Sequence, residues 1–209
     1  MRKLISHGLF GLLLACSLAA PAAHAAEAVP PDVLAKTVTD EVLATFRAGP
    51  EIRVRDFAQA VELIESKILP HFDFQTMTRL VMGKNWAQAT PEQRTALARE
   101  FRTLLARTYA TSLALYRDQA IAYRPLKLAP GDTDVIVKSV IRQPGGEPIS
   151  VDYRMEKTGS GWKVYDVELA GVSLVQNYRS VFSAEIQRSG IDGLIEALAE
   201  KNKAARRGR

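Results

Sequence analysis

Residues 149–169, ISVDYRMEKTGSGWKVYDVEL, determine the fold class of this chain. From Ile149 to Met155, apolar and polar residues alternate, which is the pattern of a strand with one buried face. Gly159-Ser160-Gly161 then forms a turn, and a second apolar run extends from Trp162 to Leu169. A turn this short joins only antiparallel strands, so the stretch predicts a β-hairpin.

The hairpin continues a longer run of strand patterns. Two more strands are expected at Ile121 to Lys127 and at Asp134 to Arg142, and Pro144-Gly145-Gly146 supplies the turn before the hairpin. On both sides of this region the apolar spacing changes from two residues to about 3.6, the period of a helix. The order helices, sheet, helices predicts an α+β fold with helices packed on one face of an antiparallel sheet meander.

The expected helices are delimited by residues that start or stop helices. The clearest start is Thr90-Pro91-Glu92-Gln93, which combines an N-cap, a first-turn proline and a capping box, and its helix is expected to run to about Arg117. The other helices are predicted from Asp32 to Gly49-Pro50, from about Val54 to Pro70, from Asp73 to Gly83, from Ser173 to Gly190, and from Asp192 into a basic tail.

The N-terminus has the pattern of a secretory signal peptide. A charged start precedes an apolar run from Leu9 to Ala20, too short to span a bilayer, and Ala23-His24-Ala25 is an A-x-A cleavage signal. Leu13-Leu14-Ala15-Cys16 also resembles a lipobox, so a lipoprotein anchored at Cys16 is the alternative. We predict a signal peptide at 1–25, a single domain at 26–200 and a basic C-terminal tail at 201–209.

Composition and charge exclude several classes of protein. The 209 residues are 47% hydrophobic and 24% charged, which excludes collagen-like, disordered and polytopic membrane chains. The net charge of +5 arises at the two ends. The leader holds two of the 28 Lys and Arg and the tail holds five more, so 21 Lys and Arg remain in the body of the chain against 23 Asp and Glu. A nearly neutral body argues against nucleic-acid binding.

Few residues remain that could carry catalysis. After cleavage the chain keeps no Cys and one His, His71, which excludes a Cys/His nucleophile pair or zinc site. His71 lies among apolar residues and is more simply explained as the end of a segment. Asp166 shares the spacing of Trp162 and Val164, so it is expected to be a buried acid satisfied by backbone or by Arg179. We predict no enzyme, no metal site and no cofactor.

Eight short motifs occur in order between about Asp32 and Lys201. Each motif is weak alone, and they are Ile68-Leu69-Pro70 with Phe72, Val81-Met82-Gly83 with Trp86, Ala89-Thr90-Pro91-Glu92-Gln93-Arg94, Phe101 with Tyr109 and Tyr116, Gly161-Trp162-Lys163-Val164-Tyr165-Asp166-Val167, Gly171-Val172-Ser173-Leu174, Asn177-Tyr178-Arg179, and Gly190-Ile191-Asp192-Gly193-Leu194. Together they resemble the MlaC-like family of periplasmic phospholipid-binding proteins, also called toluene-tolerance or ABC-transporter auxiliary proteins.

This resemblance implies a phospholipid carrier of the periplasm. Family members shuttle phospholipid between an outer-membrane lipoprotein–porin complex and an inner-membrane ABC transporter with an MCE-domain ring, and hold the acyl tails in an apolar pocket between sheet and helices. Two tails with roughly 30 methylenes cost on the order of 24 kcal/mol in water, at about 0.8 kcal/mol for each methylene. A carrier therefore needs an apolar lining and no catalytic group, which agrees with a mature chain that has no Cys and only one His.

The apolar faces of the expected elements supply candidates for the pocket lining. Ordinary core packing explains each of them equally well, because periodicity does not separate a core from a pocket. Lys163 and Arg179 are candidates for the pocket mouth, where a headgroup left in solvent would be discriminated weakly. The candidate lining residues are Phe72, Met77, Val81, Phe101, Leu105, Tyr109, Leu113, Val137, Val151, Tyr153, Trp162, Val172, Val175, Tyr178 and Phe182.

Three other functions stay open from the sequence. A carrier or sensor for another apolar ligand, such as a hopanoid, would differ only in the lipid that co-purifies. A periplasmic hydrolase would have to use Asp166 or His71. An interaction module would fill the expected pocket with its own side chains.

Overall fold

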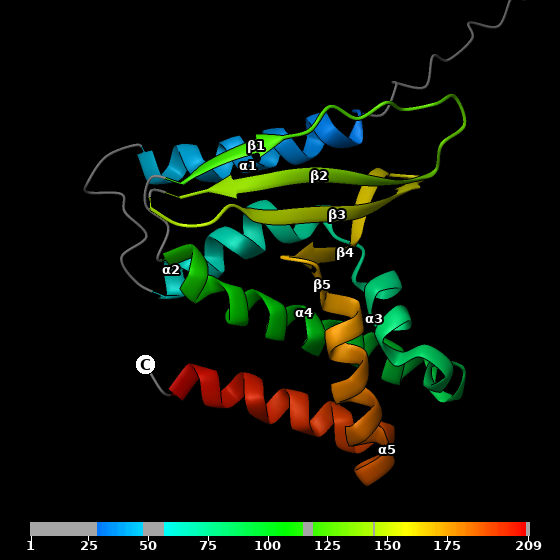
Figure 1. Ribbon diagram of the computed structural model, residues 1–209. Helices are drawn as coiled ribbons and strands as arrows, with labels where there is room; N and C mark the ends of the chain where they lie inside the picture. The colour runs from blue at the N-terminus through cyan, green and yellow to red at the C-terminus, as the bar shows by residue number, and fades with distance from the viewer. Residues whose placement is uncertain (1–28, 48–56, 115–118, 144, 208–209) are drawn as a thin grey trace, which may run out of the picture.

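A computed structural model describes residues 29–47, 57–114, 119–143 and 145–207 (Figure 1). The predicted signal peptide, Cys16 and the last two residues of the basic tail lie outside these ranges. Within the described residues, no helix combines the length and the apolar composition needed to cross a membrane.

One antiparallel sheet contains all five described strands in chain order, β1-β2-β3-β4-β5, which is the predicted meander. The predicted start and end of β2 are confirmed, β3 begins where predicted, and β4 begins one residue early. The strand expected at Ile121 to Lys127 is shorter, and β5 was not predicted. The strands are β1 (Ala120–Tyr123), β2 (Asp134–Arg142), β3 (Ile149–Thr158), β4 (Gly161–Leu169) and β5 (Val172–Ser173).

A β-bulge interrupts the pairing of β3 with β4. Arg154 lies opposite Asp166, whereas Met155 lies opposite Val164, so Tyr165 is the extra residue on β4. A bulge of this kind bends the strand and increases its twist. Asp166 is buried together with Val164 and Trp162, as the spacing predicted.

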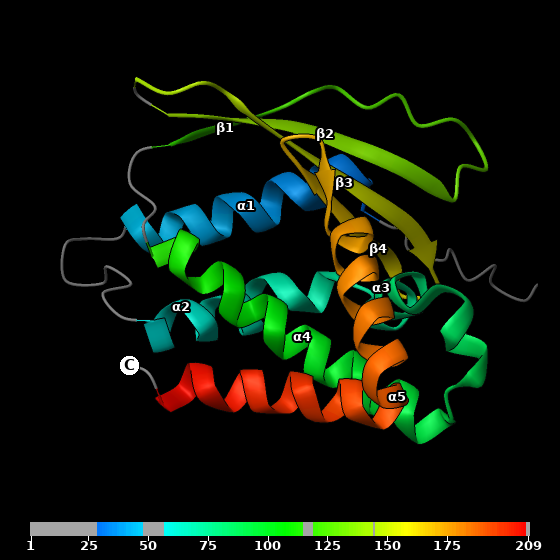
Figure 2. The same cartoon turned by 60° about the horizontal axis from the view of Figure 1, so that its bottom comes forward.

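The helices cover one face of the sheet (Figure 2), which confirms the predicted α+β arrangement. The segment expected to be one helix up to Pro70 is divided, because a π-helical turn and a 3₁₀ turn follow α2. The helices are α1 (Pro31–Arg47), α2 (Phe57–Leu63), the π-helical η1 (Ile64–Ile68), the 3₁₀-helical η2 (Leu69–His71) and η3 (Gly83–Gln88), α3 (Phe74–Met82), α4 (Pro91–Ala114) and α5 (Leu174–Arg207).

The predicted capping box at the start of α4 is present. The backbone N–H of Gln93 donates to Oγ1 of Thr90 at 3.2 Å, and the backbone N–H of Thr90 donates to Oε1 of Gln93 at 3.0 Å. At the start of α3, Oδ1 of Asp73 accepts from the backbone N–H of Thr76 at 2.9 Å. These side chains satisfy N–H groups that the first turn of a helix leaves without partners.

The predicted break at Gly190 divides α5 into two segments. Gly190 has a φ of 73° inside the helix, a conformation that L-residues rarely adopt. The second segment turns away from the first and runs beside α4 in both views (Figures 1 and 2). The predicted N-cap Asp192 accepts a hydrogen bond from Nε2 of Gln93 at 2.7 Å and so joins the kink to the start of α4.

Three apolar clusters form the interior. The helical cluster lies among α3, α4 and α5, the α2 cluster lies between α2 and α4, and the sheet cluster lies on the strands. The buried members are Met77, Val81, Met82, Leu97, Phe101, Leu104, Leu105, Val175, Phe182, Leu194 and Leu198 in the helical cluster, Ala60, Ile64, Leu69, Ala106 and Ala110 in the α2 cluster, and Val135, Val137, Met155, Trp162 and Val164 in the sheet cluster.

Candidate functional site

Most of the lining residues predicted on helices lie in or against the helical cluster. Phe101 is fully buried, and its ring meets the rings of Tyr178 and Phe182 edge-on, with centroids 5.0 and 5.2 Å away. Side chains of this group therefore pack on one another across α4 and α5. The buried members are Met77, Val81, Phe101, Leu105, Val175 and Phe182, and Phe72, Tyr109 and Tyr178 are partly buried against them.

The lining residues predicted on the strands are more dispersed. Val137 and Trp162 belong to the sheet cluster, and Tyr153 packs against it. Val151 is buried, whereas Val172 on β5 is 57% exposed. Leu113 belongs to α4, but its side chain lies outside the described residues.

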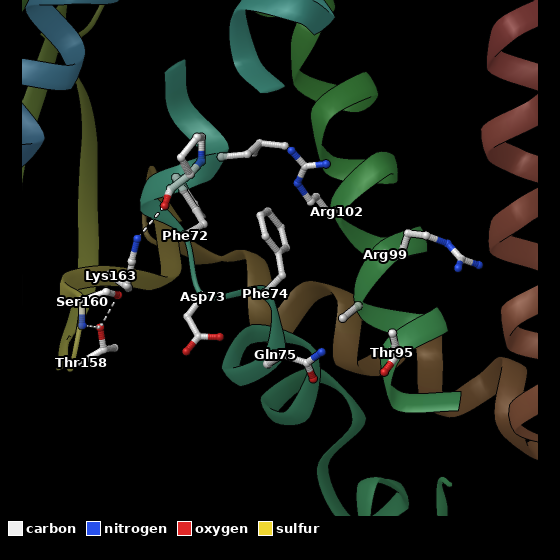
Figure 3. Close-up of a pocket in the computed structure, with 13 residues that line it drawn as sticks. Phe72, Asp73, Phe74, Gln75, Thr95, Arg99, Arg102, Thr158, Ser160 and Lys163 are labelled. Carbon is white, nitrogen blue, oxygen red and sulfur yellow. Dashed lines mark hydrogen bonds between the residues drawn. The ribbon is translucent and has the colours of Figure 1, made fainter. Parts of the chain in front are cut away.

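An open groove lies where the sheet meets the helices (Figure 3). Its volume is about 570 Å³, within the range of roughly 300–1,000 Å³ that is usual for ligand sites. The walls come from η2 and the start of α3, from one face of α4, and from the β3–β4 turn with the start of β4. The lining residues are Leu69, Pro70, Phe72, Asp73, Phe74, Gln75, Thr95, Ala98, Arg99, Arg102, Thr158, Ser160 and Lys163.

Two phenylalanines in this groove join the three apolar clusters. Phe72 packs against both the helical cluster and the sheet cluster, and Phe74 packs against both the helical cluster and the α2 cluster. The two rings stack on each other with centroids 5.9 Å apart. The groove therefore opens directly above the point where sheet and helices meet.

Cations border the apolar floor of the groove. Lys163 reaches across from β4 and donates to the carbonyl oxygen of Pro70 at 2.7 Å. Arg99 and Arg102 belong to α4 on the other side, and Arg99 pairs with Glu100 at 3.2 Å. With Asp73 as the one carboxylate among the lining residues, the groove is amphipathic and carries a positive charge.

Of the two predicted mouth residues, Lys163 lines the groove and Arg179 has a different position. The Arg179 guanidinium donates to the carbonyl oxygen of Leu80 through Nε at 3.2 Å and through a terminal nitrogen at 2.8 Å. Leu80 belongs to the last turn of α3, whose carbonyl groups lack partners within the helix. This contact ties α5 to α3.

Asp166 has a structural role in the observed geometry. Its carboxylate accepts from the hydroxyl of Ser173 at 2.6 Å and from the backbone N–H of Val175 at 3.1 Å, and the guanidinium of Arg154 lies 3.9 Å away. The backbone partner confirms the predicted cap, whereas the predicted pair with Arg179 is wrong. The buried acid fixes the start of α5 to β4.

The last residue of η2, His71, is the segment end that the sequence predicted. Burial lowers the pKa of His71 below its usual value, the positive charge of Lys163 lowers it further, and Glu41 opposes the shift. The imidazole is therefore neutral near pH 7. Within the described residues, no group of three His, Cys, Asp or Glu side chains is arranged to hold a metal ion.

This lowered pKa predicts how stability depends on pH. The unfolded chain takes up a proton on His71 near pH 6.5, whereas the folded protein resists protonation until the pH is lower. We therefore expect the contribution of His71 to the free energy of unfolding to be fully present above pH 6.5 and to be lost as the pH drops below it. Urea denaturation of the wild type and of His71→Gln, compared at about pH 7.5 and 5.5, measures the effect. An equal pH dependence in both proteins would contradict this expectation.

Of the 13 residues that line the groove, the sequence interpretation named only Phe72 and Lys163 as site residues, and Phe74, Arg99 and Arg102 are among those it missed. A weak pattern was available, since Thr95, Arg99 and Arg102 follow a spacing of four and three residues that places them on one helix face. Their proximity to Lys163 depends on how α4 packs near the β3–β4 turn, which spacing does not specify.

Comparison with known proteins gives consistent matches. The family model described as MlaC protein matches residues 36–200. A solved structure, a phospholipid-binding protein from Ralstonia solanacearum in complex with a phospholipid, is 40% identical, covers 86% of this chain and 100% of its own, and superposes with a TM-score of 0.77.

Two curated relatives match at lower identity. The toluene tolerance protein ttg2D of Pseudomonas putida is 27% identical over 212 residues, covering 98% of this chain and 96% of the relative. The intermembrane phospholipid transport system binding protein MlaC of Haemophilus influenzae is 24% identical over 173 residues, covering 81% of each chain.

Proposed function

Because the chain belongs to the MlaC protein family, we propose that it is a periplasmic carrier that binds phospholipid and moves it between membrane complexes. The observation that carries this proposal is the amphipathic groove above the junction of the three apolar clusters. An amphipathic ligand needs an apolar volume beside a polar opening, and the groove provides both. The Ralstonia relative is itself described as a complex with a phospholipid.

The acyl tails would enter between the sheet and the helices at Phe72 and Phe74. Both rings contact two clusters each, so moving them aside joins the groove to the apolar interior. Apolar side chains then replace the bilayer around the tails, which offsets the cost of about 0.8 kcal/mol for each methylene exposed to water. Binding and release require no bond to be made or broken, so the protein acts as a carrier and not as an enzyme.

The proposed exchange partners are an outer-membrane lipoprotein–porin complex and an inner-membrane MCE-domain ABC transporter. The Haemophilus relative is described as the binding protein of an intermembrane phospholipid transport system, which supports a carrier with a partner at each membrane. The pattern of a signal peptide at residues 1–25 supports export to the periplasm. In this proposal, residues 26–200 form a single lipid-binding domain, and residues 201–209 form a basic C-terminal tail.

Lipid extraction from the protein purified out of the periplasm tests the proposal. We expect mass spectrometry to find phospholipid in the extract, and the emptied protein to take up phospholipid from vesicles. Absence of lipid together with absence of uptake would refute the carrier function. A hopanoid in place of phospholipid would identify the other apolar-ligand carrier instead.

A charge placed on the groove floor should reduce lipid loading. In Phe72→Glu, a carboxylate replaces the ring that joins the helical and sheet clusters, and burying it beside an acyl chain is unfavourable. We expect about a tenfold loss of bound phospholipid per protein, equivalent to about 1.4 kcal/mol. Val181→Glu is the matched control, because Val181 on α5 is 56% exposed. Circular dichroism confirms that both variants are folded, and equal loading of the two would contradict the role of Phe72.

A further inference from the structure

We propose that the groove selects anionic phospholipid headgroups, with Arg102 of α4 and Lys163 of β4 as the side chains that bind the headgroup and Arg99 of α4 as a further positive charge at the rim. This inference rests on the proposed function and deepens it by naming the class of lipid. The preferred lipid would carry a net negative charge, as phosphatidylglycerol does, in contrast to zwitterionic phosphatidylethanolamine.

The charge of the groove supports this assignment. Its lining contains three cations and one carboxylate, that of Asp73. Both oxygens of this carboxylate already accept hydrogen bonds from Thr76, from the backbone N–H at 2.9 Å and from the hydroxyl at 3.1 Å. Asp73 is therefore committed to capping α3, which leaves the groove lining with an excess of positive charge.

Arg102 is the cation most available to a ligand. Among the described residues, no carboxylate lies within 4.0 Å of its guanidinium, whereas Arg99 already pairs with Glu100 at 3.2 Å. Arg102 is also only partly exposed, so its charge is less screened by water than that of a surface arginine. A guanidinium donates two parallel hydrogen bonds to a phosphate group, which gives both strength and orientation.

The arrangement of the cations fits a lipid headgroup. Figure 3 shows Lys163 on one side of Phe72 and Phe74, and Arg99 and Arg102 on the other. A phospholipid whose tails pass the phenylalanines would carry its phosphate at this level, between the two cationic walls. The same phosphate occurs in zwitterionic lipids, but there the headgroup ammonium would meet a site that already has a positive charge. Repulsion of that ammonium is the physical basis of the selection.

The test compares the lipids that the protein takes from vesicles made of equal amounts of phosphatidylglycerol and phosphatidylethanolamine. We expect the emptied wild-type protein to be enriched about fivefold in phosphatidylglycerol, the scale of a charge interaction at a partly exposed site. The double variant Arg99→Gln/Arg102→Gln should lose most of this enrichment, because only Lys163 then remains as a cation of the groove lining. Arg142→Gln/Lys201→Gln removes the same charge from exposed positions outside the groove lining and should keep the enrichment.

Two further variants keep the test decisive. Arg102→Gln alone should lose most of the enrichment if the double variant does not fold. Arg102→Lys keeps the charge without the planar fork, so it should retain part of the enrichment.

The possible outcomes separate this inference from the proposed function. A wild-type protein with no lipid at all would refute the carrier. A wild-type protein that binds lipid at the vesicle ratio, or a double variant with unchanged enrichment, would overturn the headgroup inference alone. Calorimetric binding of inorganic phosphate that depends on Arg102, without enrichment of phosphatidylglycerol, would also overturn it, because the groove would then serve a free anion.

Discussion

Replacing Phe101 by alanine is expected to lower the free energy of unfolding by about 4 kcal/mol, measured by urea denaturation of the lipid-free protein. The side chain is fully buried at the centre of the helical cluster, and the rings of Tyr178 and Phe182 lie edge-on to it at 5.0 and 5.2 Å. Truncation to Cβ removes these contacts and leaves a cavity that the two helices close only in part.

Val181→Ala is the matched control for this prediction. Val181 lies on α5 next to Phe182, but it is 56% exposed, so the change should cost no more than about 0.5 kcal/mol. A cost below about 1 kcal/mol for Phe101→Ala would mean that this ring faces open space in solution. The substitution therefore separates core packing from pocket lining, which the apolar spacing of α4 left undecided.

The second large effect is expected for Asp166→Ala, about 3 kcal/mol in the same measurement. The carboxylate is buried and accepts from the Ser173 hydroxyl and from the backbone N–H of Val175. Alanine would leave these donors without a partner at a place where water does not replace it, and it would remove the charge that faces Arg154 at 3.9 Å. The start of α5 would then lose its connection to β4.

Asp152→Ala on the neighbouring strand is the control for Asp166. Its carboxylate lies 3.8 Å from the ammonium of Lys138, whose side chain is 51% exposed, so loss of this pair should cost at most about 1 kcal/mol. Similar costs for both substitutions would contradict the buried-cap role. In Asp166→Asn, the amount of bound phospholipid per folded protein should be unchanged, since Asp166 does not line the groove. A loss of lipid in that variant would assign Asp166 a direct role in the site.

Local features of the fold were predictable because they depend on neighbours in the chain. The capping box of Thr90 and Gln93, the cap at Asp73 and the break at Gly190 each involve residues within one helical turn. The limits of β2 were likewise set by alternation and flanking turn residues. These features need no knowledge of how distant segments pack.

The departures from prediction have a different origin. The extra residue Tyr165 on β4 is visible only in the register against β3, and the two-residue strand β5 exists because it pairs with β4. The π-helical turn after α2 precedes Pro70, whose missing N–H ends regular helical bonding. The bulge and β5 depend on a partner strand, and the change of helix type before Pro70 is a detail that apolar periodicity does not record.

The residues of the groove were predicted only in part, because their proximity depends on how distant segments pack. Phe72 and Lys163 were named from the sequence and lie in the groove, where Phe72 forms an isolated β-bridge with Val164 of β4. Arg99 and Arg102 belong to the polar face of a long helix, where a solvated surface is the usual explanation of charge. Only the tertiary structure shows that this face borders the stacked phenylalanines.

The hydrogen bonds that tie the helices to the sheet also determine how the two layers can separate. Bonds from the starts of α3 and α5 reach β4: the backbone N–H of Asp73 donates to the carbonyl oxygen of Val164, and the carboxylate of Asp166 accepts from the backbone N–H of Val175. At the opposite edge, the hydroxyl of Tyr123 on β1 bonds to the carbonyl of Ala35 on α1. The sheet and the helices are therefore connected along β4, which can serve as a hinge axis. Rotation about that axis would part the sheet and α1 from the other helices while every strand pair remained intact.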